Sequence, residues 1–286
     1  MFRAIVAILS VLGATILSCA APAPSEHPVA PQRIVSLTPA LTEIVFAVGA
    51  GDRVVGVTEF CDFPAEAKSR PKVGGYVNPS VEAVVALKPD LVLVSPGPGN
   101  RDAALAMGRA GLRVEVVQAE TLNDSLVAIE SVARLVGREN AGNEVVSRVR
   151  ERLASVSRRV AGAPRVATLF CIQTEPIIAA GSDTLPAQIL EIAGGRNVVA
   201  EPRYPRMSLE AVVAAKPEVI LQARMDAPTD PGASPEEAFW ARWPQIPAVA
   251  ARRVVLLDSG VALRPGPRVA DAAEALAAIL HPGVSR

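Results

Sequence analysis

The longest regular pattern in the chain is a helical repeat over residues 138–160. Apolar side chains recur there at steps of four, four, three and four residues, the spacing of one helix face: Val145, Val149, Leu153, Val156 and Val160. Arginine and glutamate occupy many of the positions between them. The pattern predicts a single amphipathic helix about 33 Å long, roughly the diameter of a small domain. Gly162 and Pro164 end it.

Two similar segments lie on either side of this helix. Residues 80–93 (SVEAVVALKPDLVL) and 208–221 (SLEAVVAAKPEVIL) are identical at nine of fourteen positions. The only two tyrosines, Tyr76 and Tyr204, each precede the first serine of a segment by four residues. A repeat of this length is too long for a solenoid, so we interpret the chain as two similar lobes joined by a helical strut.

Strand-like apolar runs alternate with helical patterns in both halves, which predicts an α/β fold with mainly parallel sheets covered on both faces. The strand runs are 33–37, 54–57, 91–94, 114–117, 165–170, 177–180, 219–222 and 254–257. The helical patterns are 39–48, 101–110, 122–136, 185–193 and 269–280. We expect an N-terminal lobe at 32–137, a linking helix at 138–162 and a C-terminal lobe at 163–286.

The first residues have the pattern of an export signal. Arg3 precedes an apolar run over residues 4–17, about the length of a signal-peptide core. The run ends Ile-Leu-Ser-Cys19, which resembles the lipobox of bacterial lipoproteins, with isoleucine where leucine is usual. We predict a signal peptide at 1–19, a lipid on Cys19 and a flexible tether at 20–31. The alternative is ordinary cleavage after Ala20 or Ala21, which would leave the protein free in the periplasm instead of anchored to a membrane.

Charge and composition exclude several functions. The chain has 29 lysines and arginines against 29 aspartates and glutamates, so no net field favours nucleic acid. Its only histidines, His27 and His281, lie near the ends, which argues against a histidine metal site or general base. Neither a phosphate-binding loop nor a G-x-S-x-G motif occurs, so we expect no enzyme, no metal and no cofactor. Three cysteines are too few for a disulfide scaffold, and we expect Cys61 and Cys171 to be free or buried thiols in loops of a cleft.

Several side chains fall where ligands of parallel sheets bind, in loops that follow strands. Phe60 and Tyr76 lie in such loops, although rings there could equally cover the core. Arg264 follows the last strand run and could bind an anionic or amide-bearing ligand, or be a solvated loop charge. Glu82 opens a helix, a position that stabilises any carboxylate. Trp240 and Trp243 are spaced as core residues.

The motifs together resemble a known family. They are the lipobox-like start, the long strut, residues 33–39 (RIVSLTP), Thr42-Glu43, residues 88–92 (KPDLV) and residues 264–268 (RPGPR). In these the chain resembles the substrate-binding proteins of bacterial ABC importers that carry cobalamin, ferric siderophores or haem. The resemblance covers most of residues 31–282. It implies two Rossmann-like lobes, a rigid connecting helix, modest closure and a ligand held between the lobes.

The resemblance also assigns roles to particular residues. In that family one glutamate per lobe docks onto arginines of a permease dimer, and Glu82 and Glu210 match those positions. The loop around Phe60 and the Gly-Tyr76 pair look like the cobalamin branch. The residues that match cleft positions of that branch are Phe60, Tyr76, Phe170, Tyr204 and Arg264. Residues 95–99 lack the tryptophan that cobalamin binders often carry, which keeps an iron siderophore or haem as the alternative ligand.

Three hypotheses for function follow. The first is an extracytoplasmic binding protein, monomeric, that delivers a corrinoid or ferric chelate to an ABC permease dimer with its ATPase subunits. The second is a stand-alone sensor or scaffold of the same fold, against which the retained pair Glu82 and Glu210 argues. The third is an exported α/β enzyme, which the absence of a catalytic constellation disfavours.

Overall fold

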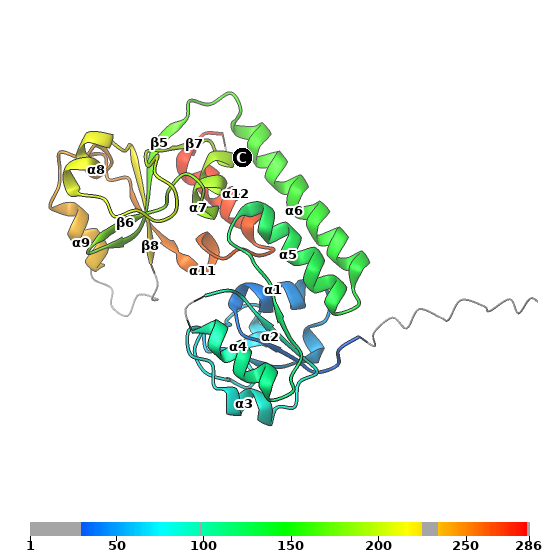
Figure 1. Ribbon diagram of the computed structural model, residues 1–286. Helices are drawn as coiled ribbons and strands as arrows, with labels where there is room; N and C mark the ends of the chain where they lie inside the picture. Colours follow the sequence, from blue (N-terminus) through cyan, green and yellow to red (C-terminus); the bar gives the residue numbers. More distant parts are fainter. Residues whose placement is uncertain (1–29, 98, 225–233, 285–286) are drawn as a thin grey trace, which may run out of the picture.

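The computed structural model describes residues 30–97, 99–224 and 234–284, which form two α/β lobes joined by one long helix (Figure 1). The N-terminal lobe is built on a four-stranded sheet with the order β2-β1-β3-β4. All of its strand pairs are parallel. Its strands are β1 (Ile34–Ser36), β2 (Val54–Val57), β3 (Leu91–Val94) and β4 (Val114–Val116).

The C-terminal lobe is built on a five-stranded sheet with the order β6-β5-β8-β9, in which β7 also pairs with β5. Only the β5–β6 pair is antiparallel among the strands described. The strands are β5 (Val166–Thr174), β6 (Ile177–Ala179), β7 (Gly195–Asn197), β8 (Val219–Arg224) and β9 (Val254–Asp258). The predicted α/β class with mainly parallel sheets is confirmed.

Helices cover both sheets and carry the chain between them. Those of the N-terminal half are α1 (Pro39–Ala47), η1 (Gly51–Arg53), α2 (Ala65–Lys68), α3 (Val81–Ala86), α4 (Asn100–Arg109), α5 (Leu122–Leu135) and α6 (Glu139–Val160). Those of the C-terminal half are α7 (Leu185–Ile192), α8 (Leu209–Ala215), α9 (Pro235–Ala241), α10 (Pro247–Ala250), α11 (Ser259–Ala262) and α12 (Val269–Leu280). None of the described helices is both long enough and apolar enough to cross a bilayer.

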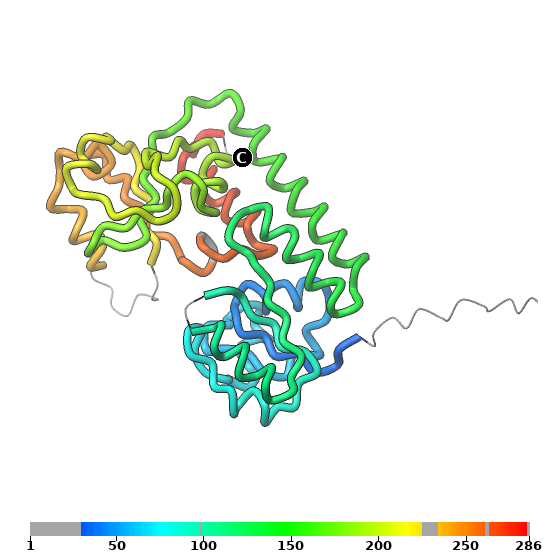
Figure 2. The backbone as a smooth tube through the Cα atoms, viewed as in Figure 1, coloured from blue at the N-terminus to red at the C-terminus, as the bar shows by residue number. Residues whose placement is uncertain are grey.

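The predicted strut is α6, which runs along the side of the molecule from one lobe to the other (Figure 1). The five side chains of its apolar face are buried, each worth about 2 kcal/mol of transfer free energy. This face packs on α5 of the first lobe and α12 of the second. In Figure 2 the red α12, near the C-terminus, lies beside the green α6. The strut therefore belongs to the cores of both lobes.

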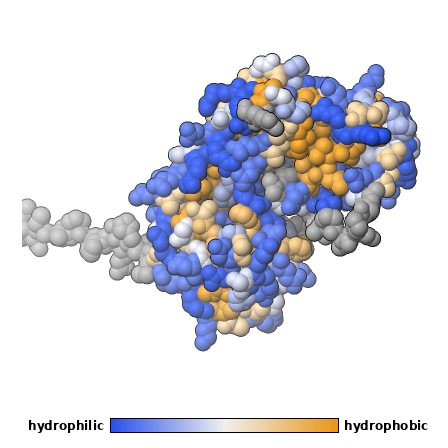
Figure 3. Space-filling view, turned by 180° about the vertical axis from the view of Figure 1, so that it is seen from behind, coloured by the Kyte–Doolittle hydropathy of each residue, from blue (hydrophilic) through white to orange (hydrophobic). Residues whose placement is uncertain are grey.

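One apolar core runs through the junction of the lobes. It includes side chains of α1, α5 and β1 in the first lobe and of α7, α12 and β8 in the second, with the buried face of α6 between them. Each lobe also has one smaller apolar cluster of its own, and the cluster in the second lobe is built around the fully buried Trp240. Seen from behind, further apolar side chains gather on part of the C-terminal lobe's surface (Figure 3).

Side-chain caps mark the starts of several helices. The Thr38 hydroxyl accepts a hydrogen bond from the Leu41 backbone N–H, with Pro39 as the first helical residue. In the repeated segments, the Ser80 and Ser208 hydroxyls accept from the backbone N–H of the residue three positions later. The predicted signal peptide, Cys19 and most of the predicted tether lie outside the described residues.

Candidate functional site

A cavity of about 890 Å³ lies between the two lobes. In the N-terminal lobe its wall comes from the segments that follow all four strands, including Thr38 after β1, Phe60 after β2, Ser95 after β3 and Glu120 after β4. In the C-terminal lobe it comes from the segments after β6, β7 and β9. Carboxyl ends of parallel strands are where open α/β sheets bind ligands. The two lobes therefore present their binding edges to one shared space.

Three aromatic rings line this cavity, as the sequence predicted: Phe60 and Tyr76 from the first lobe and Tyr204 from the second. Phe60 is 57% exposed, while the next residue, Cys61, is buried; its thiol accepts a hydrogen bond from the Thr42 hydroxyl at 3.2 Å and shares one with the Thr58 hydroxyl at 3.2 Å. The buried thiol thus anchors the loop that turns the Phe60 ring outward. Such exposed rings offer flat apolar faces to a ligand.

The Tyr204 loop is anchored by backbone contacts. The Asp183 carboxylate accepts a hydrogen bond from the Arg203 backbone N–H at 2.5 Å, and the Gly181 N–H donates to the Arg203 carbonyl at 2.7 Å. Arg203 has a positive φ of 63°, which sharpens the turn just before Tyr204. Tyr204 remains 51% exposed at the rim of the cavity.

Phe170 does not belong to this group, and its predicted place in the cleft is wrong. The strand run that we expected to end at this residue continues to Thr174 as β5. Phe170 therefore lies within the sheet, fully buried in the core shared by the lobes. The same extension places Cys171 inside β5 instead of in a cleft loop.

Both described cysteines are free and buried, as expected. The Cys171 thiol donates to the Gln173 carbonyl at 3.1 Å, and burial raises its pKa to about 12. A thiol with so high a pKa is a poor nucleophile at neutral pH. The residue therefore acts as a small core side chain.

Arg264 lines the floor of the cavity, but it is not a free cation. It follows the short helix α11, which the sequence did not predict, and reaches across to the N-terminal lobe. One of its terminal nitrogens donates to Glu43 of α1 at 3.1 Å and to Asp62 at 2.5 Å, and the other to the Phe60 carbonyl at 3.4 Å. The side chain thus bridges the two lobes.

A second arginine completes this network. The Arg268 Nε lies 3.2 Å from the other carboxylate oxygen of Glu43, an ion pair that is not aligned as a hydrogen bond. Its guanidinium carbon also sits 4.2 Å from the centre of the Phe63 ring, a cation–π contact. We refer to Glu43, Asp62, Arg264 and Arg268 as the floor network.

Burial and neighbouring charges shift the pKa values of Glu43, Asp62 and Arg264 in the floor network. The Glu43 side chain is 1% exposed, and this burial raises its pKa although both arginines oppose the shift. Burial is also the largest single influence on Asp62 and opposes its ionisation, but the hydrogen bond and charge of Arg264, a backbone hydrogen bond and the charge of Arg268 together outweigh it and lower the Asp62 pKa. Burial alone would lower the pKa of Arg264, yet its two carboxylate partners raise it.

Glu120 and Asp183 are lining carboxylates that the sequence reasoning missed. Each directly precedes the threonine that caps a helix, Thr121 before α5 and Thr184 before α7. Burial raises the pKa of Tyr204, and the charges of Glu120 and Asp183 raise it further. The same acid-Thr-Leu sequence in both lobes, each time after a strand, was a signal that could have revealed them.

The two repeated glutamates lie away from the cavity, on the surface. Glu82 is in the first turn of α3 and Glu210 in the first turn of α8, and both are exposed. Backbone hydrogen bonding, helped by Ser208, lowers the pKa of Glu210, while the Ser80 hydroxyl donates to Glu82 at 3.2 Å. Figure 1 shows α3 on the outer side of one lobe and α8 on the outer side of the other. Each lobe thus presents one exposed glutamate side chain at an equivalent helix start.

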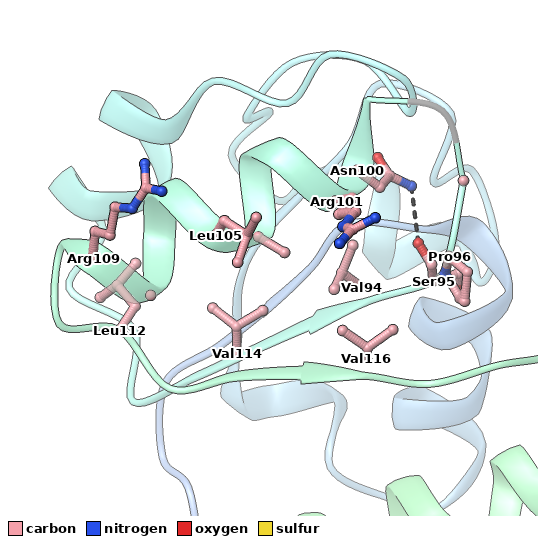
Figure 4. A pocket seen from close by; sticks show the side chains of 13 residues that line it. Val94, Ser95, Pro96, Asn100, Arg101, Leu105, Arg109, Leu112, Val114 and Val116 are labelled. Atoms are coloured by element: carbon pink, nitrogen blue, oxygen red, sulfur yellow. Dashed lines mark hydrogen bonds between the residues drawn. The ribbon is translucent and has the colours of Figure 1, made fainter.

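A second cavity of about 790 Å³ lies on the N-terminal lobe alone. Figure 4 shows Arg101, Leu105 and Arg109 of α4 extending over Val114 and Val116 of β4. Its wall meets that of the first cavity at Ser95 and Pro96. Because this second cavity is lined by one lobe only, we take the space between the lobes as the candidate binding site.

Within the described residues, no group of three or more histidine, cysteine or carboxylate side chains is arranged to hold a metal ion.

Comparison with known proteins agrees with this architecture. The profile of the family described as "periplasmic binding protein" matches residues 34–261. A vitamin B12-binding protein of Vibrio parahaemolyticus is 29% identical over 244 residues, which cover 84% of this chain and 86% of that protein. An uncharacterised ABC transporter substrate-binding lipoprotein of Bacillus subtilis, YvrC, is 31% identical over 260 residues, covering 88% and 81%. The solved structure of a periplasmic heme-binding protein from Pseudomonas aeruginosa superposes with a TM-score of 0.77 at 27% identity, covering 89% of this chain and 94% of that one.

Proposed function

The chain belongs to the periplasmic binding protein family and is a substrate-binding protein of the ABC-transporter type, and on that premise we propose that it captures a corrinoid between its lobes. Its relatives are substrate-binding transport proteins rather than enzymes. The observation that carries the proposal is the cavity of about 890 Å³ with the exposed rings of Phe60, Tyr76 and Tyr204 on its wall. A corrin is a large flat macrocycle, and rings contributed by both lobes can cover it from two sides.

The chemistry of the cavity wall favours a corrinoid over haem or a ferric siderophore. Iron in haem takes a histidine, cysteine, methionine or tyrosine ligand. Of these, only Tyr76 and Tyr204 occur among the described residues that line the cavity. Burial raises the pKa of both phenols, and the charge of Glu120 raises it further. Haem iron would need one of these tyrosines as its ligand, whereas a corrinoid cobalt already surrounded by its own ligands needs none from the protein.

The ligand can be identified by colour. Purified protein is incubated in turn with cobalamin, haem and a ferric siderophore, passed through a desalting column, and the absorbance of the protein fraction recorded. We expect the corrinoid spectrum at one equivalent. Co-elution of haem or siderophore alone would replace the proposal with the alternative ligand, and co-elution of none would reject both.

The contribution of the rings can be tested with a matched pair of variants. Phe60 lines the cavity, whereas Phe63, three residues on in the same loop and 42% exposed, lies outside the cavity lining and stacks on Arg268. Covering about 80 Å² of the Phe60 ring at about 25 cal/mol per Å² gives roughly 2 kcal/mol, or about thirtyfold in Kd. Phe60→Ala should therefore weaken corrinoid binding by that factor and Phe63→Ala only slightly. Equal losses would reject a contact role for Phe60.

We further propose that the loaded protein docks on a permease dimer through Glu82 and Glu210. Their exposure at equivalent helix starts on the two lobes supports this. Charge pairs of this kind mainly set the orientation of the two docked proteins and raise the rate at which they meet. The double variant Glu82→Ala/Glu210→Ala should abolish cellular uptake while the purified protein still binds its ligand. The control removes two exposed acids of α6, Glu144 and Glu151, and should retain uptake. Loss of ligand binding in the docking variant, or equal loss of uptake in the control, would reject the proposal.

The proposed location is extracytoplasmic, with a lipid on Cys19 as anchor. The resemblance of residues 16–19 to a lipobox supports it. Mass spectrometry of the membrane fraction should find a diacylated N-terminal cysteine, and Cys19→Ser should release the protein into the soluble fraction. A mature N-terminus at Pro22, Ala21 or another residue beyond the cysteine would reject lipidation.

A further inference from the structure

The charged groups around the cavity divide into a neutralised set and an unpaired set. The floor network holds two carboxylates and two guanidinium groups within ion-pair distance, so its formal charges cancel. Both hydrogens of one terminal nitrogen of Arg264 are directed to Glu43 and Asp62. Although Arg264 lines the cavity, it has no uncompensated charge to offer to a ligand anion.

The remaining charged lining residues carry a net negative charge. Of the described residues that line the cavity, these are Glu120, Asp183 and Arg203. Glu120 and Asp183 form no ion pair within 4 Å with another described residue, and Asp183 accepts only a backbone hydrogen bond. They belong to opposite lobes, since Glu120 precedes α5 and Asp183 precedes α7.

The charges of these two carboxylates act on two of the rings that line the site. After burial, the charge of Glu120 is the next cause that raises the pKa of Tyr76, a ring of its own lobe, and of Tyr204, a ring of the opposite lobe. Asp183 acts on Tyr204 as well. A field that disfavours a phenolate at these positions equally disfavours a carboxylate brought there by a ligand.

We propose that Glu120 and Asp183 are specificity determinants that reject anionic ligands, so that the cleft selects neutral or cationic macrocycles. This inference rests on the proposed corrinoid function and narrows it. A corrin that carries amide side chains satisfies it, whereas haem brings two carboxylates, and a ferric catecholate complex is an anion because its phenolate oxygens carry more negative charge than the iron neutralises. One cation, Arg203, offsets one of the two acids, so the discrimination is moderate. About tenfold in Kd per ligand carboxylate is expected at low ionic strength, less as salt screens the charges.

A matched pair of ligands isolates charge from shape. Cobalamin and its monocarboxylic acid, in which one side-chain amide is hydrolysed, share the corrin and differ by one negative charge. The wild-type protein should bind the amide form about tenfold more tightly, and the ratio should shrink as sodium chloride is raised. In Glu120→Gln/Asp183→Asn the ratio should fall towards one. Glu144→Gln, an exposed acid of α6 remote from the cavity, should leave it unchanged.

The outcomes separate this inference from the function on which it rests. If cobalamin binds but the wild-type ratio is near one, or survives in the double variant, charge rejection is refuted and the corrinoid function stands. If neither corrinoid binds the wild type, the proposed function fails. In that case haem tests the inference separately. Haem should bind the double variant at least tenfold more tightly than the wild type, and equal affinities would refute charge rejection.

Discussion

Replacing Glu43 with alanine tests whether the floor network stabilises the junction between the lobes. The substitution leaves Arg264 and Arg268, each only 18% exposed, facing a single carboxylate, Asp62. Removing one partner of a fully buried ion pair costs about 3–5 kcal/mol. Because both guanidinium groups keep some contact with water, we expect the low end of that range, about 3 kcal/mol.

The assay is urea unfolding followed by far-UV circular dichroism, with the free energy of unfolding taken from the linear extrapolation. Because one core runs through both lobes, we expect a single transition with an unchanged slope. Glu43→Gln keeps the side-chain volume and removes the charge, which separates electrostatic loss from the loss of packing.

Asp62→Ala is the matched comparison, because it removes the other carboxylate from the same arginine. The Asp62 side chain is 56% exposed, so water can replace it and the expected cost is about 0.5–1 kcal/mol. If Asp62→Ala destabilises the protein as much as Glu43→Ala, burial does not determine how much each carboxylate contributes to the free energy of unfolding, and the reasoning is refuted. A Glu43→Ala protein as stable as the wild type would refute it as well.

Three further predictions concern the strut and the core. Arg152 of α6 pairs with Glu274 of α12 at 2.8 Å and with Asp271 at 2.7 Å, and it lowers the Glu274 pKa, so the contribution of the Glu274 pair is present above about pH 4.5 and is lost as the pH falls. Arg152→Gln should therefore cost about 0.5–1 kcal/mol in urea unfolding at pH 7 and progressively less as the pH falls below about 4.5. A Cβ on Gly142 would lie 2.4 Å from that of Ala133, so Gly142→Val should raise the unfolding rate and cost about 1–3 kcal/mol, with partial recovery in the double variant that also carries Ala133→Gly. Mass spectrometry should find Cys171 unmodified by N-ethylmaleimide in the native protein and modified in urea, because the thiol is buried and its pKa is about 12; rapid native labelling would contradict this.

Local patterns were sufficient to predict much of the fold. The bounds of the helix over residues 139–160 were predicted to within one or two residues, because its apolar spacing persists for the whole length and glycine and proline follow it. The starts of α1, α3 and α8 are equally local, because they are capped by Thr38, Ser80 and Ser208, whose hydroxyls bind backbone groups only three residues away. In each case the determining interaction lies within a few positions in the sequence.

The errors arose where a strand is too short to show an apolar pattern or where the sequence does not mark the end of a strand. β7 is three residues long, Gly-Arg-Asn, and exists because it pairs with β5, so no apolar alternation marks it. Phe170 was expected at the end of its strand run and, from the family resemblance, in the cleft, but the strand continues through residues that pair with β6 and β8. Strand ends depend on partners that the local sequence does not reveal.

The chemistry of the cavity depends on contacts distant in sequence. Arg264 was expected after the last strand and does line the cavity, yet its partner Glu43 is 221 positions away and was noted only as part of a motif. Whether an arginine offers its charge to a ligand depends on such partners. The sequence therefore predicted that an arginine would line the cavity, whereas only the fold shows that its charge is already paired with carboxylates.

The floor network and the strut together constrain how the cleft can work. At the back, α6 belongs to a core that includes side chains of both lobes, so separating the lobes would expose apolar surface. At the floor, the same separation would break the ion pairs of Glu43 with Arg264 and Arg268 and leave a buried carboxylate unpaired. Both costs oppose a wide opening. A ligand therefore meets a site whose shape is largely set in advance. Little of the free energy of its contacts with the rings is then offset by the cost of ordering the lobes. A pre-formed site of this kind favours selection by shape and charge, which is the form of selectivity that Glu120 and Asp183 can supply.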